Sequence, residues 1–365
     1  ACIGCRIAMI EKLIRHRFED REEELSMYAV RSSRSKGRKV FEDPSPIRTE
    51  FQRDKDRILH CKAFRRIKHK TQVFIAPTGD HFATRLAHTL EVSQVARTIS
   101  RALNLNEDLT EAIALGHDMG HPPFGHIGED ELNRIHVDGF KHSKQSLRIV
   151  DYLEKDGKGL NLTWEVRHGI VSHSKPRGNF LNKEVPDNLT LEGQVCRISD
   201  AVAYLNHDLA DAFRAGLLTE SDLPEEVSDL GAGHSARING MVMDIVKSSW
   251  NVSGLGDENS KNQPLIMMSP EMGQVVDILR EFMFQNIYIP EDQSEEGKAA
   301  RRIMRLLYEY YYGNPSEIPS GYALKDQSKE QDVVDYISGM TDQYALRTAE
   351  RIRVGITRIF SSRFI

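Results

Sequence analysis

Two histidines and two aspartates are of the residue types that bind a divalent metal ion: His88, the adjacent pair His117 and Asp118, and Asp200. Imidazole and carboxylate ligands together suit Mg, Mn, Fe, Co, Ni or Zn, and four protein ligands leave room for water or a phosphate oxygen. A cation held there would acidify a water molecule or polarise a phosphoryl oxygen. The pattern therefore indicates a catalytic site with one divalent metal ion and phosphoester hydrolysis as its chemistry.

The run Gly116–Glu129 contains three histidines and two carboxylates, which are His117, Asp118, His121, His126 and Glu129. A lone histidine is more often a hydrogen-bonded structural residue, but this density has no simple packing explanation. Pro122, Pro123 and Gly125 predict a break that turns His121 and His126 back toward the metal.

Apolar residues recur at spacings of three and four along most of the chain, which is typical of helices. Helices are predicted over residues 9–24, 49–68, 82–103, 107–117, 144–153, 163–172, 191–215, 236–247, 271–287, 297–312 and 329–346. Strand signal is scarce, and residues 73–75 alone are predicted as a short strand. The sequence therefore predicts an all-α protein.

The chain has 365 residues, of which 39% are hydrophobic and 28% charged, as in an ordinary soluble globular protein. No apolar run approaches the roughly 20 residues of a membrane helix, and no secretory leader is visible. We therefore expect a cytoplasmic location and no membrane partner. Four cysteines are too few for a disulfide framework, and Cys2 with Cys5 is a weak zinc or redox signal.

The net charge of −5 argues against non-specific nucleic-acid binding by the whole chain. Residues 31–39 nevertheless form a basic segment, which we expect to be a solvated, flexible arm. It is the one feature that would let the chain meet a polyphosphate, single-stranded nucleic acid or a neighbouring subunit.

Six segments resemble the HD-superfamily deoxynucleoside triphosphate triphosphohydrolases, and in particular the bacterial dGTPase-like proteins: residues 64–73, 84–92, 117–129, 139–143, 161–167 and 198–204. The likeness runs from about Arg48 to Tyr344. It implies an all-α HD-type fold, and residues 1–25 have no counterpart in the family. We therefore divide the chain into an N-terminal helix and basic arm (1–45), an HD-type catalytic core (46–215) and a C-terminal helical region packed on that core (216–365). The likeness also implies hydrolysis of a dNTP, dGTP among them, to deoxynucleoside and inorganic triphosphate.

The resemblance implies a role for each site residue. His88, His117, Asp118 and Asp200 match the metal ligands, and His121 matches a histidine on the α-phosphate. His126 and Glu129 match an acid/base pair, and their spacing of three supports this because both side chains then share one face of a turn. The remaining matches are to substrate-binding residues: Arg85 and His142 for the phosphates, Gln72 and Asp208 for the 3′-hydroxyl, and Tyr204 under the sugar.

Six further histidines are expected to be structural, since nothing nearby in the sequence completes a site: His60, His69, His81, His168, His173 and His207. Two alternatives remain open. One is an HD phosphohydrolase for a nucleoside monophosphate, cyclic nucleotide or alarmone, and the other is a nucleotide sensor or single-strand-binding regulator. The family likeness also leads us to expect a homo-oligomer, a hexamer or smaller, with dNTP activation at an allosteric site.

Overall fold

Helices make up the regular structure of this protein. The computed structural model describes residues 14–75, 82–174, 185–231, 233–255, 264–324 and 327–363, so Cys2, Cys5 and His81 lie outside the described residues. Within those ranges the only β-type pairing consists of isolated bridges, Arg38 with Thr163 and Thr71 with Thr84. The prediction of an all-α fold is confirmed, and the predicted strand at residues 73–75 is wrong.

Residues 14–22 are helical, and sixteen further α-helices follow in the described ranges. Their bounds are α2 (Glu50–His60), α3 (Lys62–Arg66), α4 (Arg85–Ala102), α5 (Glu107–Gly116), α6 (Gly125–Ile135), α7 (His142–Arg148), α8 (Glu154–Gly157), α9 (Trp164–Ser172), α10 (Leu191–Arg214), α11 (Glu225–Ser228), α12 (His234–Ser248), α13 (Pro270–Met283), α14 (Ile289–Gln293), α15 (Glu295–Gly313), α16 (Lys329–Ser338) and α17 (Asp342–Ile352).

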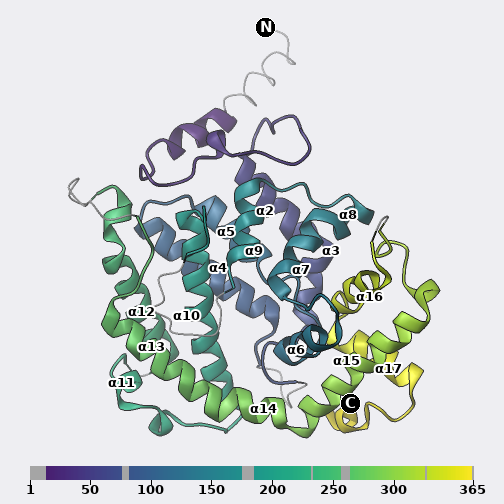
Figure 1. The fold of residues 1–365 in the computed structure, drawn as a ribbon. Helices are drawn as coiled ribbons and strands as arrows, with labels where there is room; N and C mark the ends of the chain where they lie inside the picture. Colours follow the sequence, from purple (N-terminus) through teal and green to yellow (C-terminus); the bar gives the residue numbers. More distant parts are fainter. Residues whose placement is uncertain are drawn as a thin grey trace.

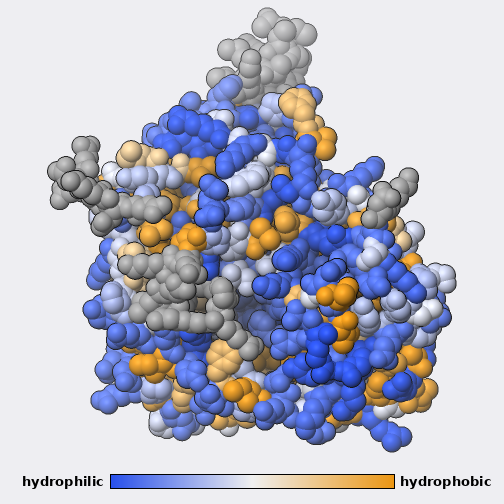
Figure 2. All heavy atoms as spheres, viewed as in Figure 1, coloured by the Kyte–Doolittle hydropathy of each residue, from blue (hydrophilic) through white to orange (hydrophobic). Residues whose placement is uncertain are grey.

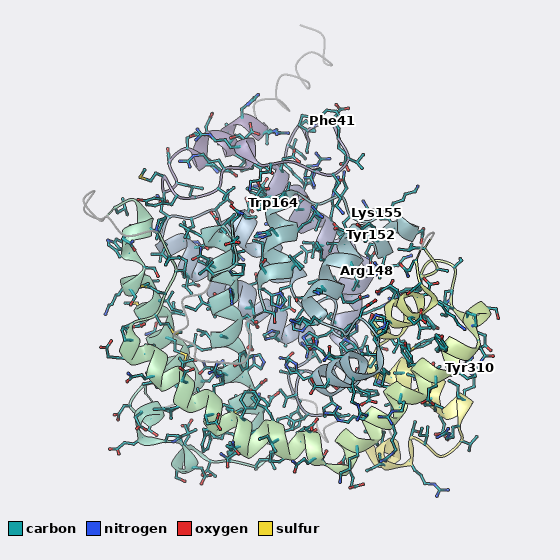
Figure 3. The ribbon with its side chains drawn as sticks, viewed as in Figure 1. Phe41, Arg148, Tyr152, Lys155, Trp164 and Tyr310 are labelled. Carbon is teal, nitrogen blue, oxygen red and sulfur yellow. The ribbon has the colours of Figure 1, made fainter. Side chains whose placement is uncertain are left out.

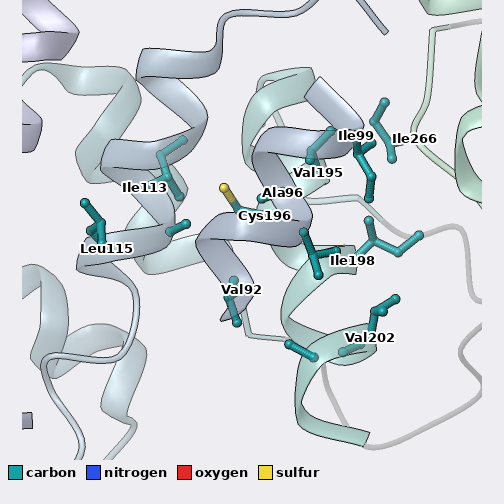
Figure 4. Packing of buried hydrophobic residues seen from close by; sticks show 14 of the residues in the cluster. Val92, Ala96, Ile99, Ile113, Leu115, Val195, Cys196, Ile198, Val202 and Ile266 are labelled. Carbon is teal, nitrogen blue, oxygen red and sulfur yellow. The ribbon is translucent and has the colours of Figure 1, made fainter. Parts of the chain in front are cut away.

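Helices α4, α5 and α10 form the centre of the molecule and pack directly on one another. Each begins at a capping side chain that accepts a backbone N–H of the first turn, namely Thr84, Asn106 and Thr190. Such a cap contributes about 1 kcal/mol to helix stability. The three helices bury aliphatic faces against one another, and Val92, Ala96 and Ile99 of α4 lie in one cluster with Val195, Ile198 and Val202 of α10 (Figure 4).

Two hydrophobic cores hold the remaining helices. The larger one joins the central helices to α12 and α13. The second joins Phe124, Ile127 and Leu132, from the start and inner face of α6, to apolar side chains of α15, α16 and α17. Figure 1 shows α13, α14 and α15 running along the lower edge of the molecule from one core to the other. The C-terminal region therefore contacts the central helices through α12 and α13, and it contacts α6 through its last helices.

Several predicted helix boundaries are wrong. The helix predicted over 49–68 breaks at Cys61, which is extended and whose thiol accepts the N–H of Phe64 as the cap of α3. The helix predicted over 329–346 breaks before Thr341, which caps α17. Helix α6 was not predicted, because the prolines and glycines before it resemble a loop. It begins after Phe124, which lies in the left-handed region at φ 64°.

The basic segment 31–39 is partly solvent-exposed, as predicted, but its basic side chains are paired within the chain, which corrects the prediction of a free arm. Arg38 bonds to Glu50 at 2.9 Å and also to Asp54, and Lys39 Nζ lies 2.8 Å from Asp151. Lys36 Nζ lies 3.5 Å above the ring of Trp164, which begins α9 close to this segment (Figure 3). These basic groups already have partners within the chain.

None of the described helices is long and apolar enough to cross a bilayer. On the face shown in Figure 2, hydrophobic residues form small groups separated by hydrophilic ones.

A buried carboxyl at the start of α10 makes the stability of the fold depend on pH. Glu192 is fully buried, its Oε1 accepts the N–H groups of Val30 (2.9 Å) and Asn106 (3.2 Å), and burial raises its pKa from 4.5 to about 7. Because the folded chain holds this proton more tightly than the unfolded chain, the free energy of unfolding should fall as pH rises from 4.5 to 7, by up to about 3 kcal/mol.

Glu192→Gln retains an oxygen for both N–H groups and cannot ionise, so this part of the pH dependence should disappear. Urea unfolding at pH 5, 6, 7 and 8 would measure it, with the exposed Glu226→Gln as matched control. A variant that parallels the parent chain at every pH would contradict the assignment.

Candidate active site

Three central helices bring the four predicted metal ligands to one point. His88 lies in the first turn of α4, His117 and Asp118 follow the end of α5, and Asp200 lies in the middle of α10. His88 Nε2 is 3.3 Å from His117 Nε2, 3.5 Å from an oxygen of Asp118 and 3.2 Å from an oxygen of Asp200. Residues separated by more than one hundred positions thus converge on one point.

The tautomer of His117 favours a cation at this point. Its Nδ1 lies 2.6 Å from the carbonyl oxygen of Ala114 and donates to it, so the neutral ring presents a lone pair at Nε2. Burial by itself raises the pKa of Asp118 and Asp200, but neighbouring histidines hold both pKa values below their ordinary range, together with Arg85 in the case of Asp118. Two carboxylates and ring nitrogens facing one another fit a divalent metal ion, which would be held by His88, His117, Asp118 and Asp200.

Arg85 lies beside the cluster, and some of its N–H donors have no partner among the described residues. It is 1% exposed and its Nη1 lies 2.7 Å from Asp118, while its Nε and Nη2 have no hydrogen-bond partner among the described residues. Gln72 is also buried, and its Oε1 is likewise unpaired there. A Cβ on Gly125, at φ 56°, would come within 3.2 Å of Arg85 Nη2 and 3.1 Å of the Gln72 carbonyl oxygen. Glycine at this position therefore leaves room for the guanidinium.

Three histidines and Glu129 form a second group beside the first. The rings of His121 and His142 stack with centroids 3.9 Å apart, and His121 Nε2 lies 3.4 Å from Asp118. Burial lowers the pKa of His121 well below its ordinary value, so this ring is neutral near pH 7. Burial also lowers the pKa of His142, but the charge of Glu129 and its hydrogen bond raise it to a net value above the ordinary one.

The carboxylate of Glu129 lies closer to His142 than to His126. Its carboxylate lies 2.8 Å from His142 Nδ1 and accepts the backbone N–H of that residue at 2.7 Å, whereas His126 Nδ1 is 3.5 Å away. The side chain of His126 is 65% exposed. The structure thus brings the predicted acid/base pair together, with His126 at the solvent side of the group.

Two histidines that were expected to be structural lie in the cluster, which corrects that expectation. His173 Nε2 is 3.0 Å from His142 Nε2, and burial lowers the pKa of His173 to about 3. The ring of His207 lies 5.0 Å from that of His88, with its nitrogens 2.9 Å from Glu91 and 3.0 Å from Asp208. The sequence could have indicated His207 as a site residue, because it directly precedes Asp208 on a predicted helix. No local sequence pattern indicated His173.

Asp200, Tyr204 and Asp208 recur every four residues along α10, as the predicted ridge requires. Asp208 is buried, and its Oδ2 accepts the hydroxyl of Tyr288 at 2.8 Å. Tyr204 is half-buried between Asp200 and Asp208, and burial raises the pKa of its hydroxyl. The polar groups of this ridge therefore extend from the predicted metal ligands to the π-helical turn Phe284–Tyr288 after α13.

Sequence comparisons place these features in a known family. The HD domain family matches residues 85–205, and a phosphohydrolase-associated domain matches residues 266–351. A deoxyguanosinetriphosphate triphosphohydrolase-like protein of Caldanaerobacter subterraneus subsp. tengcongensis is 50% identical over 88% of this chain and 90% of its own length. The protein belongs to this dGTPase-like family of HD hydrolases.

Other members are similar over most of their length. Proteins with the same name from Desulfatibacillum aliphaticivorans and Bartonella quintana are 46% and 40% identical, covering 93% and 90% of this chain and 97% and 95% of their own lengths. The resemblance found from the sequence motifs is therefore confirmed at the level of the family.

In this HD hydrolase, the phosphohydrolase-associated region contributes directly to the geometry of the site. Lys70 Nζ, which is buried, donates to the carbonyl oxygens of His121 (2.5 Å) and Ser338 (2.8 Å). Asp342, the first residue of α17, accepts the N–H groups of Thr71 (2.8 Å) and Phe124 (3.0 Å). These bonds fix the residue before Gln72 and the residue before α6, so helices far along the chain set the positions of Gln72 and His126.

The bonds of Asp342 lead to a prediction. In Asp342→Asn only one side-chain oxygen remains to accept hydrogen bonds, whereas the carboxylate of Asp342 has two. The N–H of either Thr71 or Phe124 therefore loses its acceptor. Loss of one such bond costs about 1–3 kcal/mol. We expect a lower melting temperature and a loss of hydrolysis that exceeds the loss of stability, because α6 carries His126 and Glu129.

Thermal unfolding and turnover measured on the same preparations test this prediction. The exposed Asp229→Asn is the matched control and should leave both quantities unchanged. Full turnover in Asp342→Asn at a temperature where it is folded would show that this contact does not position the site.

Proposed function

We propose that this hydrolase acts on deoxynucleoside triphosphates, dGTP among them, and releases the deoxynucleoside and intact inorganic triphosphate. The observation that carries the proposal is the convergence of two histidines, two aspartates and the partly unpaired guanidinium of Arg85 on one buried point. Together with the names of the relatives, this arrangement supports a site for a divalent metal and a chain of phosphates.

The metal ion, held by His88, His117, Asp118 and Asp200, would supply positive charge and polarise the α-phosphate. Arg85 has two donor nitrogens to offer to phosphate oxygens, and guanidinium matches phosphate in a bidentate manner. His121 is stacked and neutral, so it can donate one ring N–H to a phosphate oxygen without taking a proton from it.

The reaction itself requires one proton transfer at the leaving group. A water oxygen bonds to the α-phosphorus, the bond from phosphorus to the 5′-oxygen breaks, and the 5′-oxygen takes up a proton. We assign proton transfer to His126, because it lies at the solvent side of the cluster with Glu129 beside its Nδ1 to orient the ring. His126 would either donate a proton to the 5′-oxygen or take one from the attacking water.

Recognition of the sugar is assigned to the ridge on α10 and to Gln72. Tyr204 would pack under the deoxyribose, where its bulk opposes a 2′-hydroxyl. The carboxylate of Asp208 and the unpaired Oε1 of Gln72 can both accept from a 3′-hydroxyl. This group of side chains distinguishes a deoxynucleoside triphosphate from the other substrates of HD phosphohydrolases.

The decisive experiment incubates the protein with each of the four dNTPs, singly and mixed, with Mg²⁺ or Mn²⁺, and separates the products by chromatography. We expect deoxynucleoside and triphosphate, and little turnover of GTP. Release of orthophosphate or pyrophosphate, or turnover confined to a nucleoside monophosphate, cyclic nucleotide or alarmone, would overturn the proposal. Faster turnover in the mixture would reveal the expected dNTP activation.

Removing a metal ligand should abolish metal binding and turnover together. His117→Ala or Asp200→Ala takes away one of the groups that face the cation, and the remaining carboxylate and imidazole groups bind it too weakly. Metal content by mass spectrometry and turnover should both fall to background. The exposed His60→Ala at the end of α2 is the control, and it should retain both.

Removing His126 should separate binding from chemistry. His126→Ala leaves the four metal ligands in place, so metal content and dNTP affinity should stay close to those of the parent chain. Turnover should fall by about a hundredfold or more, the usual effect of losing a general acid or base. A variant with unchanged turnover would remove His126 from the mechanism.

A further inference from the structure

His207 lies between two carboxylates that come from neighbouring helices. Its Nδ1 is 2.9 Å from Glu91 Oε2, and its Nε2 is 3.0 Å from Asp208 Oδ1. Glu91 belongs to α4, whereas His207 and Asp208 belong to α10. The side chains of His207 and Asp208 are buried, but that of Glu91 is 40% exposed. The ring therefore connects a buried carboxylate to one at the boundary with solvent.

This arrangement favours a ring with a proton on both nitrogens. A neutral imidazole has one N–H and one lone pair, so it would turn the lone pair toward one of the two carboxylates. The doubly protonated ring presents an N–H to each of them. Its positive charge also offsets the buried charge of Asp208, which would otherwise be costly.

The other oxygen of Asp208 is held by Tyr288. The hydroxyl of Tyr288 donates to Asp208 Oδ2 at 2.8 Å from the π-helical turn after α13. Asp208 Oδ1 is buried close to the ring of His207, yet it has no aligned hydrogen bond among the described residues. The orientation of the carboxylate is therefore set from two sides, while one oxygen keeps a lone pair for a donor on a ligand.

We infer that Glu91 and His207 are positioning residues that act through Asp208. They hold its carboxylate ready for the 3′-hydroxyl of the substrate, and they thereby favour a nucleotide with a free 3′-hydroxyl over one that lacks it. The inference rests on the proposed function, in which Asp208 accepts that hydroxyl. A carboxylate that is already oriented needs little reorganisation when the hydroxyl donates to it, so more of the bond energy is available for binding and turnover.

The competing explanation is a purely structural contact. The ring of His207 also packs on that of His88, with centroids 5.0 Å apart, and it lies between the packed helices α4 and α10. Damage to this packing or to the metal ligands would lower the turnover of every nucleotide equally. An effect through Asp208 disappears when the substrate has no 3′-hydroxyl, so a matched pair of substrates separates the two explanations.

The test compares dGTP with 2′,3′-dideoxyGTP, which differs only by the missing 3′-hydroxyl. The measured quantity is the ratio of their kcat/KM values with Mn²⁺. For the parent chain we expect a preference for dGTP of roughly 10- to 100-fold, the usual effect of a hydrogen bond to a charged group. His207→Gln should reduce this ratio by about fivefold or more, because the charged partner of Asp208 is lost.

Two further variants support the comparison. Glu91→Gln is an isosteric change of a partly exposed side chain, so it tests the inference even if His207→Gln does not fold. It should reduce the ratio in the same direction by a smaller factor. The exposed His60→Gln is the matched control and should keep the ratio of the parent chain.

A double-mutant comparison shows whether His207 acts through Asp208. Asp208→Asn removes the carboxylate that His207 holds, so adding His207→Gln to it should change the ratio no further. Equal losses for both nucleotides in His207→Gln and Glu91→Gln would overturn the inference, as would an additional fall of the ratio in the double mutant.

Calorimetry with Ca²⁺ in place of Mn²⁺ measures the affinity for both nucleotides without turnover. A parent chain that prefers dGTP in binding, loses this preference in the two variants and releases no triphosphate would overturn the proposed function alone. A chain that releases triphosphate from dGTP with the same ratio in the parent and both variants would overturn this inference alone. A chain that binds neither nucleotide would overturn both.

Discussion

The buried charge of Asp118 is the constraint on which the rest of the site depends. An isolated buried carboxylate is costly, and it persists only where cations or donors surround it. Asp118 has Arg85 at 2.7 Å and histidine nitrogens on every other side. Arg85 and His88 come from α4, whereas His117 and His121 lie beside Asp118 in the turn after α5, so these two helices must pack in one particular way to stabilise the carboxylate.

The buried cluster of histidines and carboxylates also explains why so much polar structure surrounds it. Buried polar groups that face one another are costly unless their neighbours hold them in place and satisfy them. The central helices supply apolar packing, and the C-terminal helices supply hydrogen bonds through Lys70 and Asp342. Asp335 of α16 adds bonds to Arg148 of α7, the helix that begins at His142. The phosphohydrolase-associated region is therefore part of the catalytic architecture.

A similar arrangement holds Asp208, at the end of the site for which sugar binding is proposed. His207 lies between Glu91 and Asp208, and although burial lowers its pKa, these two carboxylates raise it to about 10. An imidazolium there fixes one oxygen of Asp208 while Tyr288 bonds to the other. The carboxylate thus keeps its orientation before any substrate arrives, and it needs little reorganisation to accept a hydroxyl.

The amino-acid sequence by itself determined the helical class, the ridge on α10 and the four candidate metal ligands. The helical class and the ridge follow from spacings of three and four, which act within one helix, whereas the candidate ligands follow from residue type and from the resemblance to the family. Tertiary structure alone decided that α6 forms after a run of prolines and glycines, because its apolar face is buried against α15. It also decided that the basic segment is paired, since Asp54 and Asp151 lie far from Arg38 and Lys39 along the chain. Finally, it brought His173 beside His142 and Asp342 beside Phe124, because contacts between distant segments leave no periodic trace in the sequence.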